Sequence, residues 1–175
     1  MIFALEGISA VGKSSVAAVL EDAGLPVFRD PVRHGLLGDL NRRELFLAGN
    51  QCGLTLAHFA PVLDFVADRW CLSSFVYDVW GDVTLDGAYL TRLLPIYART
   101  PARVYLLRVD PDLAYRRMLD RAVGPTYSRE QLHALDRGFS RAAEVWAGLG
   151  GHVREVDATD VPAAAATVLE DVRTP

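Results

Sequence analysis

The stretch GISAVGKS, residues 7–14, decides the fold of this chain. It matches the pattern G-x-x-x-x-G-K-S/T at every position, follows the apolar run at residues 2–5 and opens a helical pattern at residues 13–23. In that context the glycines let the backbone wrap around phosphate oxygens, and the amide groups of the loop and of the helix N-terminus face the anion. The stretch therefore predicts a phosphate-binding loop between a first strand and a first helix.

This loop predicts a site for ATP with Mg²⁺. We expect Lys13 to reach the β- and γ-phosphates and Ser14 to hold Mg²⁺. The alternative is a chance match in another α/β protein, which the preceding strand and the following helix disfavour. The residues expected to contact ATP are Gly7, Ser9, Ala10, Val11, Gly12, Lys13, Ser14 and Ser15.

Outward from the loop, short β-type runs alternate with longer helical patterns, which is typical of a parallel α/β sheet. Neither an internal repeat nor a low-complexity linker divides the chain, so we expect one domain over residues 1–175. Further strands are expected at 26–29, 65–67, 104–109 and 152–156, and helices at 42–63, 85–99, 111–121, from 128 onward and at 161–173.

The composition disfavours two classes of protein, those that bind nucleic acid and those that span a membrane. The formal net charge is −4, which disfavours a nucleic-acid-binding surface. No apolar stretch approaches the roughly 18 residues that a membrane span needs, and the start of the chain lacks the basic region of a signal peptide. We therefore expect a cytoplasmic enzyme whose partners are ATP and a small molecule, rather than nucleic acid or a membrane.

Asp68 and Arg69 follow the apolar run at residues 65–67 directly. In a parallel α/β sheet the carboxyl end of a strand borders the ligand crevice. An Asp at that place is expected to hold Mg²⁺ together with Ser14, and Arg69 is expected to enter the same crevice. The alternative is a surface Asp-Arg pair at a strand end.

Two arginines, Arg117 and Arg121, lie four residues apart on one helical face ahead of the Gly124-Pro125 break. Phosphoryl transfer spreads negative charge over the equatorial phosphate oxygens, and a mobile arginine stabilises that charge. We expect residues 117–129 to form a closing lid with these two arginines as catalytic groups. A solvated basic face is the alternative for both of them.

Five segments carry a family resemblance: Phe3–Gly7, Arg29–Pro31, Glu44–Ala48, Asp68–Trp70 and Val109–Pro111. In this order, and over nearly the whole chain, they resemble thymidylate kinases, within the wider group of nucleoside and nucleoside-monophosphate kinases. The resemblance implies a three-layer P-loop NTPase fold with a five-stranded parallel sheet flanked by helices. It also implies ATP with Mg²⁺ and a homodimer, since thymidylate kinases are often dimers.

The resemblance further implies an acceptor pocket. Phe46 would stack on an acceptor base, Arg69 would hold an acceptor or transferred phosphate, and Tyr77 would line the pocket. Asn50 and Gln51 stand about where thymidylate kinases place an arginine that reads the base, and amides can also read a base edge. With the carboxylate of Asp30, the acceptor-binding set is Asp30, Phe46, Asn50, Gln51, Arg69 and Tyr77.

Asp30 keeps a second acceptor class open. Asp30-Pro31-Val32 resembles the Glu-Pro-Val of deoxynucleoside kinases, where the carboxylate serves as base, and the segment between Asp30 and Asp68 is shorter than in thymidylate kinases. A hydroxyl acceptor must lose a proton, whereas a phosphate acceptor is largely ionised already. A turn-forming Asp before proline is the structural alternative. The expected catalytic set is Lys13, Asp30, Arg69, Arg117 and Arg121.

Three functions thus stand side by side. The first is a kinase acting on a nucleoside monophosphate, as the order of the motifs indicates. The second is a kinase acting on a hydroxyl of a nucleoside or of another small metabolite or antibiotic, as Asp30 indicates. The third is a nucleotide-binding module that hydrolyses ATP poorly and has no acceptor, which the arginines at 117–129 disfavour.

Overall fold

A five-stranded parallel sheet forms the centre of the computed structural model, which describes residues 1–29, 42–80, 87–121 and 127–173. The strand order is β2-β3-β1-β4-β5, and every neighbouring pair is parallel. This confirms the predicted α/β fold. The strands are β1 (Ile2–Glu6), β2 (Val27–Arg29), β3 (Phe65–Asp68), β4 (Ala102–Arg108) and β5 (His152–Asp157).

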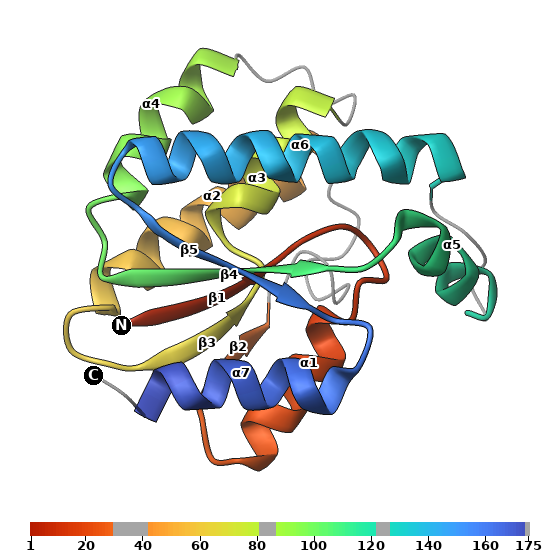
Figure 1. Cartoon of the computed structure of the whole chain (residues 1–175). Coiled ribbons are helices and arrows are strands. Elements are labelled where there is room, and N and C mark those ends of the chain that lie inside the picture. The colour runs from red at the N-terminus through yellow and green to blue at the C-terminus, as the bar shows by residue number, and fades with distance from the viewer. Residues whose placement is uncertain (30–41, 81–86, 122–126, 174–175) are drawn as a thin grey trace.

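Helices cover both faces of the sheet, as Figure 1 shows. On one face α1 (Lys13–Asp22) packs beside α7 (Val161–Arg173), and on the other α3 (Cys71–Trp80) packs beside α6 (Arg129–Gly148). No helix within the described stretches is long and apolar enough to cross a bilayer. The remaining helices are α2 (Arg42–Phe59), α4 (Gly87–Tyr97) and α5 (Pro111–Leu119).

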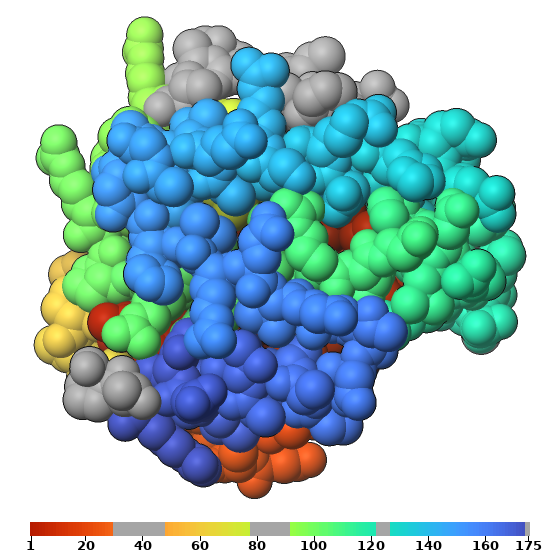
Figure 2. Space-filling view, in the orientation of Figure 1, coloured from red at the N-terminus to blue at the C-terminus, as the bar shows by residue number. Residues whose placement is uncertain are grey.

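The core is centred on β1, which lies between β3 and β4 and is buried at all five residues. Central parallel strands are covered on both faces, and this is why residues 2–5 form a continuous apolar run. In Figure 2 the start of the chain (red) is visible only in small patches between later segments. From β1 the chain continues to β2 and β3 on one side, and β4 and β5 lie on the other. The residues after β1 therefore sit where the strand order reverses, the usual place for a ligand.

Helix α2 ends at Phe59, four residues before the predicted end of its apolar pattern. The ammonium group of Met1 donates hydrogen bonds to the carbonyl oxygens of Ala60, at 2.6 Å, and Leu63, at 2.9 Å. It also pairs with the carboxylate of Asp64 at 2.6 Å. Pro61 has no amide hydrogen and disfavours helical backbone at Ala60, so the helix ends there, and the contacts of Met1 hold the residues that follow.

Helix α3 was not predicted from the sequence. Helices usually start after Ser, Thr, Asp or Asn, whose side chain accepts a hydrogen bond from the first turn. Trp70 occupies that position ahead of Cys71 and has no side-chain acceptor. The cap comes instead from Glu6, at the end of β1.

Candidate active site

The loop after β1 has the backbone shape that a phosphate-binding loop requires. Gly7 and Gly12 have φ values of 137° and 114°, in the region that favours glycine. A Cβ at Gly7 would lie 2.6 Å from the carbonyl oxygen of Leu107, so this position has no room for a side chain. Helix α1 begins directly after Gly12, which has no side chain to cap it. The first amide groups of α1 are consequently open to an anion.

Lys13 lies over this loop. Its Nζ donates hydrogen bonds to the carbonyl oxygens of Gly7 and Ile8, each at 2.7 Å, and the residue is 4% exposed. The ammonium charge is therefore held against the loop, close to the amide groups at the start of α1. The expected contact of Lys13 with the β- and γ-phosphates of ATP stays a prediction.

Ser14 and Asp68 are in contact next to the phosphate-binding loop. The Oγ of Ser14 donates a hydrogen bond of 2.7 Å to Oδ2 of Asp68. Asp68 is 4% exposed, and its Oδ1 accepts no hydrogen bond from the part of the chain that the structure describes. A hydroxyl oxygen and a carboxylate oxygen with spare acceptor capacity are the ligands that Mg²⁺ prefers. The residues present therefore fit the metal that the motif implies.

Arg69 adopts a left-handed backbone conformation, with φ 78°. Its amide donates to the carbonyl oxygen of Leu5 at 3.1 Å, and its guanidinium carbon lies 5.9 Å from the centre of the Tyr77 ring. The Nη1 atom is buried and has no hydrogen-bond partner within the described stretches. A buried cationic donor without a partner carries a desolvation cost that an anionic ligand would offset.

Glu6 joins the loop to the start of α3, a connection that the sequence did not reveal. The carboxylate is fully buried and accepts hydrogen bonds from the amides of Trp70, Leu72 and Ser73 at 2.9, 3.0 and 3.1 Å, and from the Ser73 hydroxyl. Burial raises the pKa of Glu6, while the hydrogen bonds from Ser73 and Trp70 act in the opposite direction. The available signal was a lone carboxylate at the end of an otherwise apolar strand.

Arg117 contacts the loop from α5. Its Nη1 donates to the carbonyl oxygens of Val11, at 3.2 Å, and Ala158, at 3.3 Å, and its Nη2 donates to that of Thr159 at 2.9 Å. The guanidinium thus connects the phosphate-binding loop to the turn after β5, a turn that sequence reasoning left without a role. Arg121 follows α5 and is exposed. The catalytic roles expected for both arginines stay predictions, as does the lid at 117–129, of which residues 122–126 lie outside the described residues.

Of the other predicted acceptor residues, Asn50 and Gln51 lie on α2 within the described part of the chain, whereas Asp30 and the side chain of Phe46 do not. Asn50 is 2% exposed on α2, and the next residue, Gln51, is exposed. Helix α2 is fixed next to the 68–70 turn, because the indole nitrogen of Trp70 donates to the carbonyl oxygen of Gly53 at 3.2 Å. Asp30 lies outside the described residues, and so does the side chain of Phe46.

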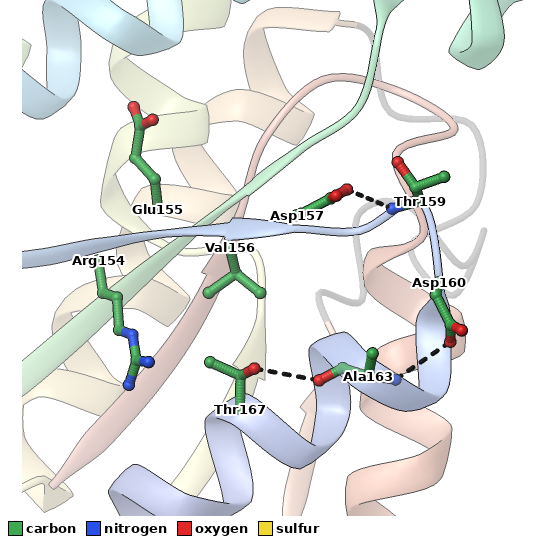
Figure 3. Close-up of a pocket in the computed structure, with 8 residues that line it drawn as sticks. All are labelled: Arg154, Glu155, Val156, Asp157, Thr159, Asp160, Ala163 and Thr167. Carbon is green, nitrogen blue, oxygen red and sulfur yellow. Dashed lines mark hydrogen bonds between the residues drawn. The ribbon is translucent and has the colours of Figure 1, made fainter.

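A separate hollow of about 510 Å³ opens between β5 and the start of α7 (Figure 3). Two of its acidic side chains are occupied by local turns: Asp157 accepts from the amide of Thr159 at 2.8 Å, and Asp160 from that of Ala163 at 3.1 Å. The third, Glu155, pairs with Arg108 at 2.6 Å, and the lining cation, Arg154, is paired with Asp171 at 2.5 Å. Carboxylates without a metal disfavour phosphate. The phosphate-binding loop, and not this hollow, is therefore the candidate active site.

Comparison with known proteins supports the fold. No protein-family model matches the chain, and no curated protein matches it in sequence. Among solved structures, deoxyadenosine kinase from M. mycoides with dCMP and dCDP has a TM-score of 0.67 at 19% identity. The alignment covers 99% of this chain and 99% of the kinase. The YorR protein of Bacillus subtilis in complex with phosphorylated GDP has a TM-score of 0.68 at 21% identity, over 99% of this chain and 96% of its own.

A second structure of the M. mycoides deoxyadenosine kinase, with bound dCTP, has a TM-score of 0.68 at 18% identity over the full length of both chains. At identities this low, the likeness is one of fold. The chain therefore has the P-loop fold of the deoxyadenosine kinase structures, with helices on both faces of a five-stranded parallel sheet. The more specific resemblance to thymidylate kinases stays a prediction.

Proposed function

We propose that this chain is a phosphotransferase that moves the γ-phosphate of ATP to a nucleoside monophosphate. One observation carries the proposal: the Ser14–Asp68 hydrogen bond of 2.7 Å is formed at the end of a complete phosphate-binding loop, beside the turn that holds Arg69. A loop that only bound nucleotide would not need a second cation with a buried Nη1 atom directly after Asp68. Structures with a similar fold include those of a deoxyadenosine kinase, which agrees with phosphate transfer to a nucleoside or nucleotide.

Each residue has a distinct part in this reaction. The amides of the loop and of α1 would bind the phosphates of ATP, and Lys13 would exchange its loop carbonyls for phosphate oxygens. Ser14 and Asp68 would hold Mg²⁺, which neutralises phosphate charge when bound. Arg69 would bind the acceptor phosphate and orient it for in-line attack, so its charge also stabilises the transferring group.

The guanidinium of Arg69, whose Nη1 atom is buried, favours a phosphate acceptor over an alcohol. Its Nη1 has no partner in the described part of the chain, and an ionised phosphate supplies both the charge and the acceptor oxygens that it lacks. A nucleoside hydroxyl is the second candidate, favoured by Asp30 in the sequence and by the deoxyadenosine kinases among the fold neighbours. In that case Asp30 would take the hydroxyl proton.

The test is an ADP-release assay with Mg²⁺-ATP and a panel of all common nucleosides, their monophosphates and several hydroxyl-bearing metabolites. Turnover confined to monophosphates supports the proposal. Turnover of nucleosides or other alcohols, with monophosphates inert, replaces the acceptor class, and Asp30→Asn should then lower kcat by roughly 10² or more. ADP release without any phosphorylated product would indicate a nucleotide-binding module instead. A Lys13→Ala variant, expected to be inactive, excludes a contaminating kinase.

A further inference from the structure

The carboxylate of Glu6 receives more hydrogen bonds than a helix cap needs. Its Oε1 accepts from the amides of Trp70 and Leu72, and its Oε2 accepts from the amide and the hydroxyl of Ser73. A usual N-cap side chain satisfies one amide of the first turn. Here one side chain satisfies three amides, and none of its surface reaches solvent. Such a group fixes the backbone around it, because displacing it would strand several buried donors.

The segment that Glu6 fixes contains the working residues of the site. Trp70 is separated from Asp68 only by Arg69, whose amide is bonded to Leu5 on the same strand as Glu6. The turn at 68–70 is therefore attached to the end of β1 at two successive residues. At the other side of Glu6 the chain enters Gly7, whose carbonyl oxygen accepts from Lys13. A single carboxylate thus lies between the phosphate-binding loop and the turn with Asp68 and Arg69.

The backbone of this turn is held in an unfavourable state. The φ of 78° at Arg69 is unfavourable for a residue with a side chain, and such conformations persist only where the surroundings impose them. The flanking hydrogen bonds to Leu5 and Glu6 impose it here. Without them the turn would relax, Arg69 would leave its place beside Tyr77, and Asp68 would shift relative to Ser14.

From this geometry we propose that Glu6 is a positioning residue for phosphoryl transfer: its buried carboxylate keeps Asp68 and Arg69 in place relative to the phosphate-binding loop. The proposal rests on the proposed function of the same site. In this proposal, Glu6 contacts neither the substrate nor the metal ion. It acts on both through the 68–70 turn, as residues behind metal ligands do when they set ligand orientation.

Glu6→Gln is the direct test. The amide is similar in size, but it offers one acceptor oxygen and places an NH₂ group against amide donors, so the four hydrogen bonds cannot all form. We expect the Mg²⁺ concentration for half-maximal activity to rise by about 10-fold and kcat to fall by about 10–100-fold. ATP binding in EDTA should change less than about 2-fold, because the loop amides are retained. Tryptophan fluorescence, with Trp70 in the turn itself, reports binding of ATP with and without Mg²⁺ and needs no acceptor.

Val168→Ala is the matched control, since Val168 is fully buried on α7, which covers the face of the sheet opposite α3. It should lower the unfolding temperature by loss of packing but leave the Mg²⁺ dependence unchanged. If Glu6→Gln and Val168→Ala differ only in stability, Glu6 is a structural cap and the proposal is wrong. If the wild-type protein phosphorylates no acceptor, the proposed function fails, but the fluorescence titration with Mg²⁺-ATP still decides the role of Glu6.

Ser73→Ala provides an independent variant where Glu6→Gln does not fold. It removes one of the four donors and keeps the carboxylate, so the half-saturating Mg²⁺ concentration for ATP binding should rise by about 3-fold. An unchanged Mg²⁺ concentration in this variant overturns the proposal as well.

Discussion

Ser14 donates a hydrogen bond of 2.7 Å to the carboxylate of Asp68, although the two residues lie on different elements, 54 positions apart in the sequence. The register of the sheet brings them together. Leu5 on β1 lies opposite Asp68 on β3, so the end of β3 reaches the start of the phosphate-binding loop. The contact joins the two residues that the sequence predicts as Mg²⁺ ligands.

Asp68→Asn should raise the Mg²⁺ requirement of the enzyme. The amide keeps a hydrogen bond with Ser14 but removes the negative charge that a divalent cation needs. We expect kcat to fall by about 10–100-fold and the half-saturating Mg²⁺ concentration to rise by a similar factor. A titration of activity against Mg²⁺ at fixed ATP measures both.

Asp64→Asn is the control, because Asp64 directly precedes the same strand at its other end. Asp64 pairs with the chain terminus, its side chain is 70% exposed, and it lies far from the loop. Its variant should show the Mg²⁺ dependence of the wild-type protein. A normal Mg²⁺ dependence in Asp68→Asn would contradict the assignment of Asp68 as a metal ligand.

Arg117→Ala should weaken both the fold and ATP binding. The guanidinium donates to three carbonyl oxygens of the loop and of the turn after β5, at 2.9 to 3.3 Å. Hydrogen bonds from charged groups contribute more than neutral ones, and Arg117 is half-buried, so we expect a loss of about 1–2 kcal/mol in the free energy of unfolding. Urea denaturation measures this loss, and a fluorescence titration measures the Kd of ATP.

The neighbouring Arg116 supplies the matched variant, because it has the same charge on the same helix but is exposed. Arg116→Ala should change the free energy of unfolding by less than about 0.5 kcal/mol. If Arg117→Ala lowers kcat alone, with stability and ATP affinity unchanged, then Arg117 is the mobile catalytic arginine that the sequence predicts.

Strands and loop could be predicted because their signals are local. Residues 2–5 are apolar since β1 is covered on both faces, and the glycines at 7 and 12 are needed by their own φ values. Helix α3 was missed because its cap, Glu6, is 64 or more residues away in the sequence. The predicted end of α2 is too late because apolar positions at helical spacing continue past Pro61, which stops the helix, and the Met1 ammonium group then holds the residues that follow.

The same distinction between local signals and long-range contacts explains which parts of the site could be predicted. The proximity of Ser14 and Asp68 could be predicted because motif and strand order bring them together, while the roles of Lys13, Ser14 and Asp68 stay predictions. The contacts of Arg117 could not be predicted, because they depend on how α5 lies against the turn after β5. The position of α2 depends on Trp70 and Tyr97, whose hydrogen bonds join α2 to the 68–70 turn and to α4 and leave no periodic signal.

Tyr105 should make stability depend on pH in the alkaline range. Burial raises the pKa of Tyr105 to about 12, and the negative charge of Asp171 acts in the same direction. An unfolded tyrosine has a pKa of about 10, so the folded state binds this proton more tightly. The resulting stabilisation is fully present below pH of about 10 and is lost as the pH rises toward about 12.

Tyr105→Phe removes the ionisable group, so the variant should lose less stability than the wild-type protein between pH values of about 9 and 11.5. Urea unfolding midpoints across this range measure the difference between the two slopes. Parallel slopes for the two proteins would show that Tyr105 does not hold its proton more tightly in the folded state.

Gly53→Ala should move the predicted acceptor helix α2 away from the 68–70 turn. A Cβ at Gly53 would lie 3.0 Å from the hydroxyl oxygen of Tyr97 and 3.6 Å from Cδ1 of Trp70. The Tyr97 hydroxyl has little freedom to withdraw, because the residue is 2% exposed and donates to the carbonyl oxygen of Asn50 at 3.1 Å. Either that hydrogen bond or the Trp70–Gly53 hydrogen bond must lengthen.

Alanine is a better helix former than glycine by about 1 kcal/mol, so a position without steric conflict should be stabilised by the same change. Gly148 on α6 is such a position, since a Cβ there would meet no atom within 4 Å. We therefore expect Gly148→Ala to raise the unfolding temperature, and Gly53→Ala to lower it and to increase the KM of the acceptor while leaving the KM of ATP unchanged. Thermal unfolding and acceptor titrations measure these effects. If both variants were stabilised and kept the wild-type acceptor KM, the close packing at Gly53 would have no part in setting the acceptor pocket.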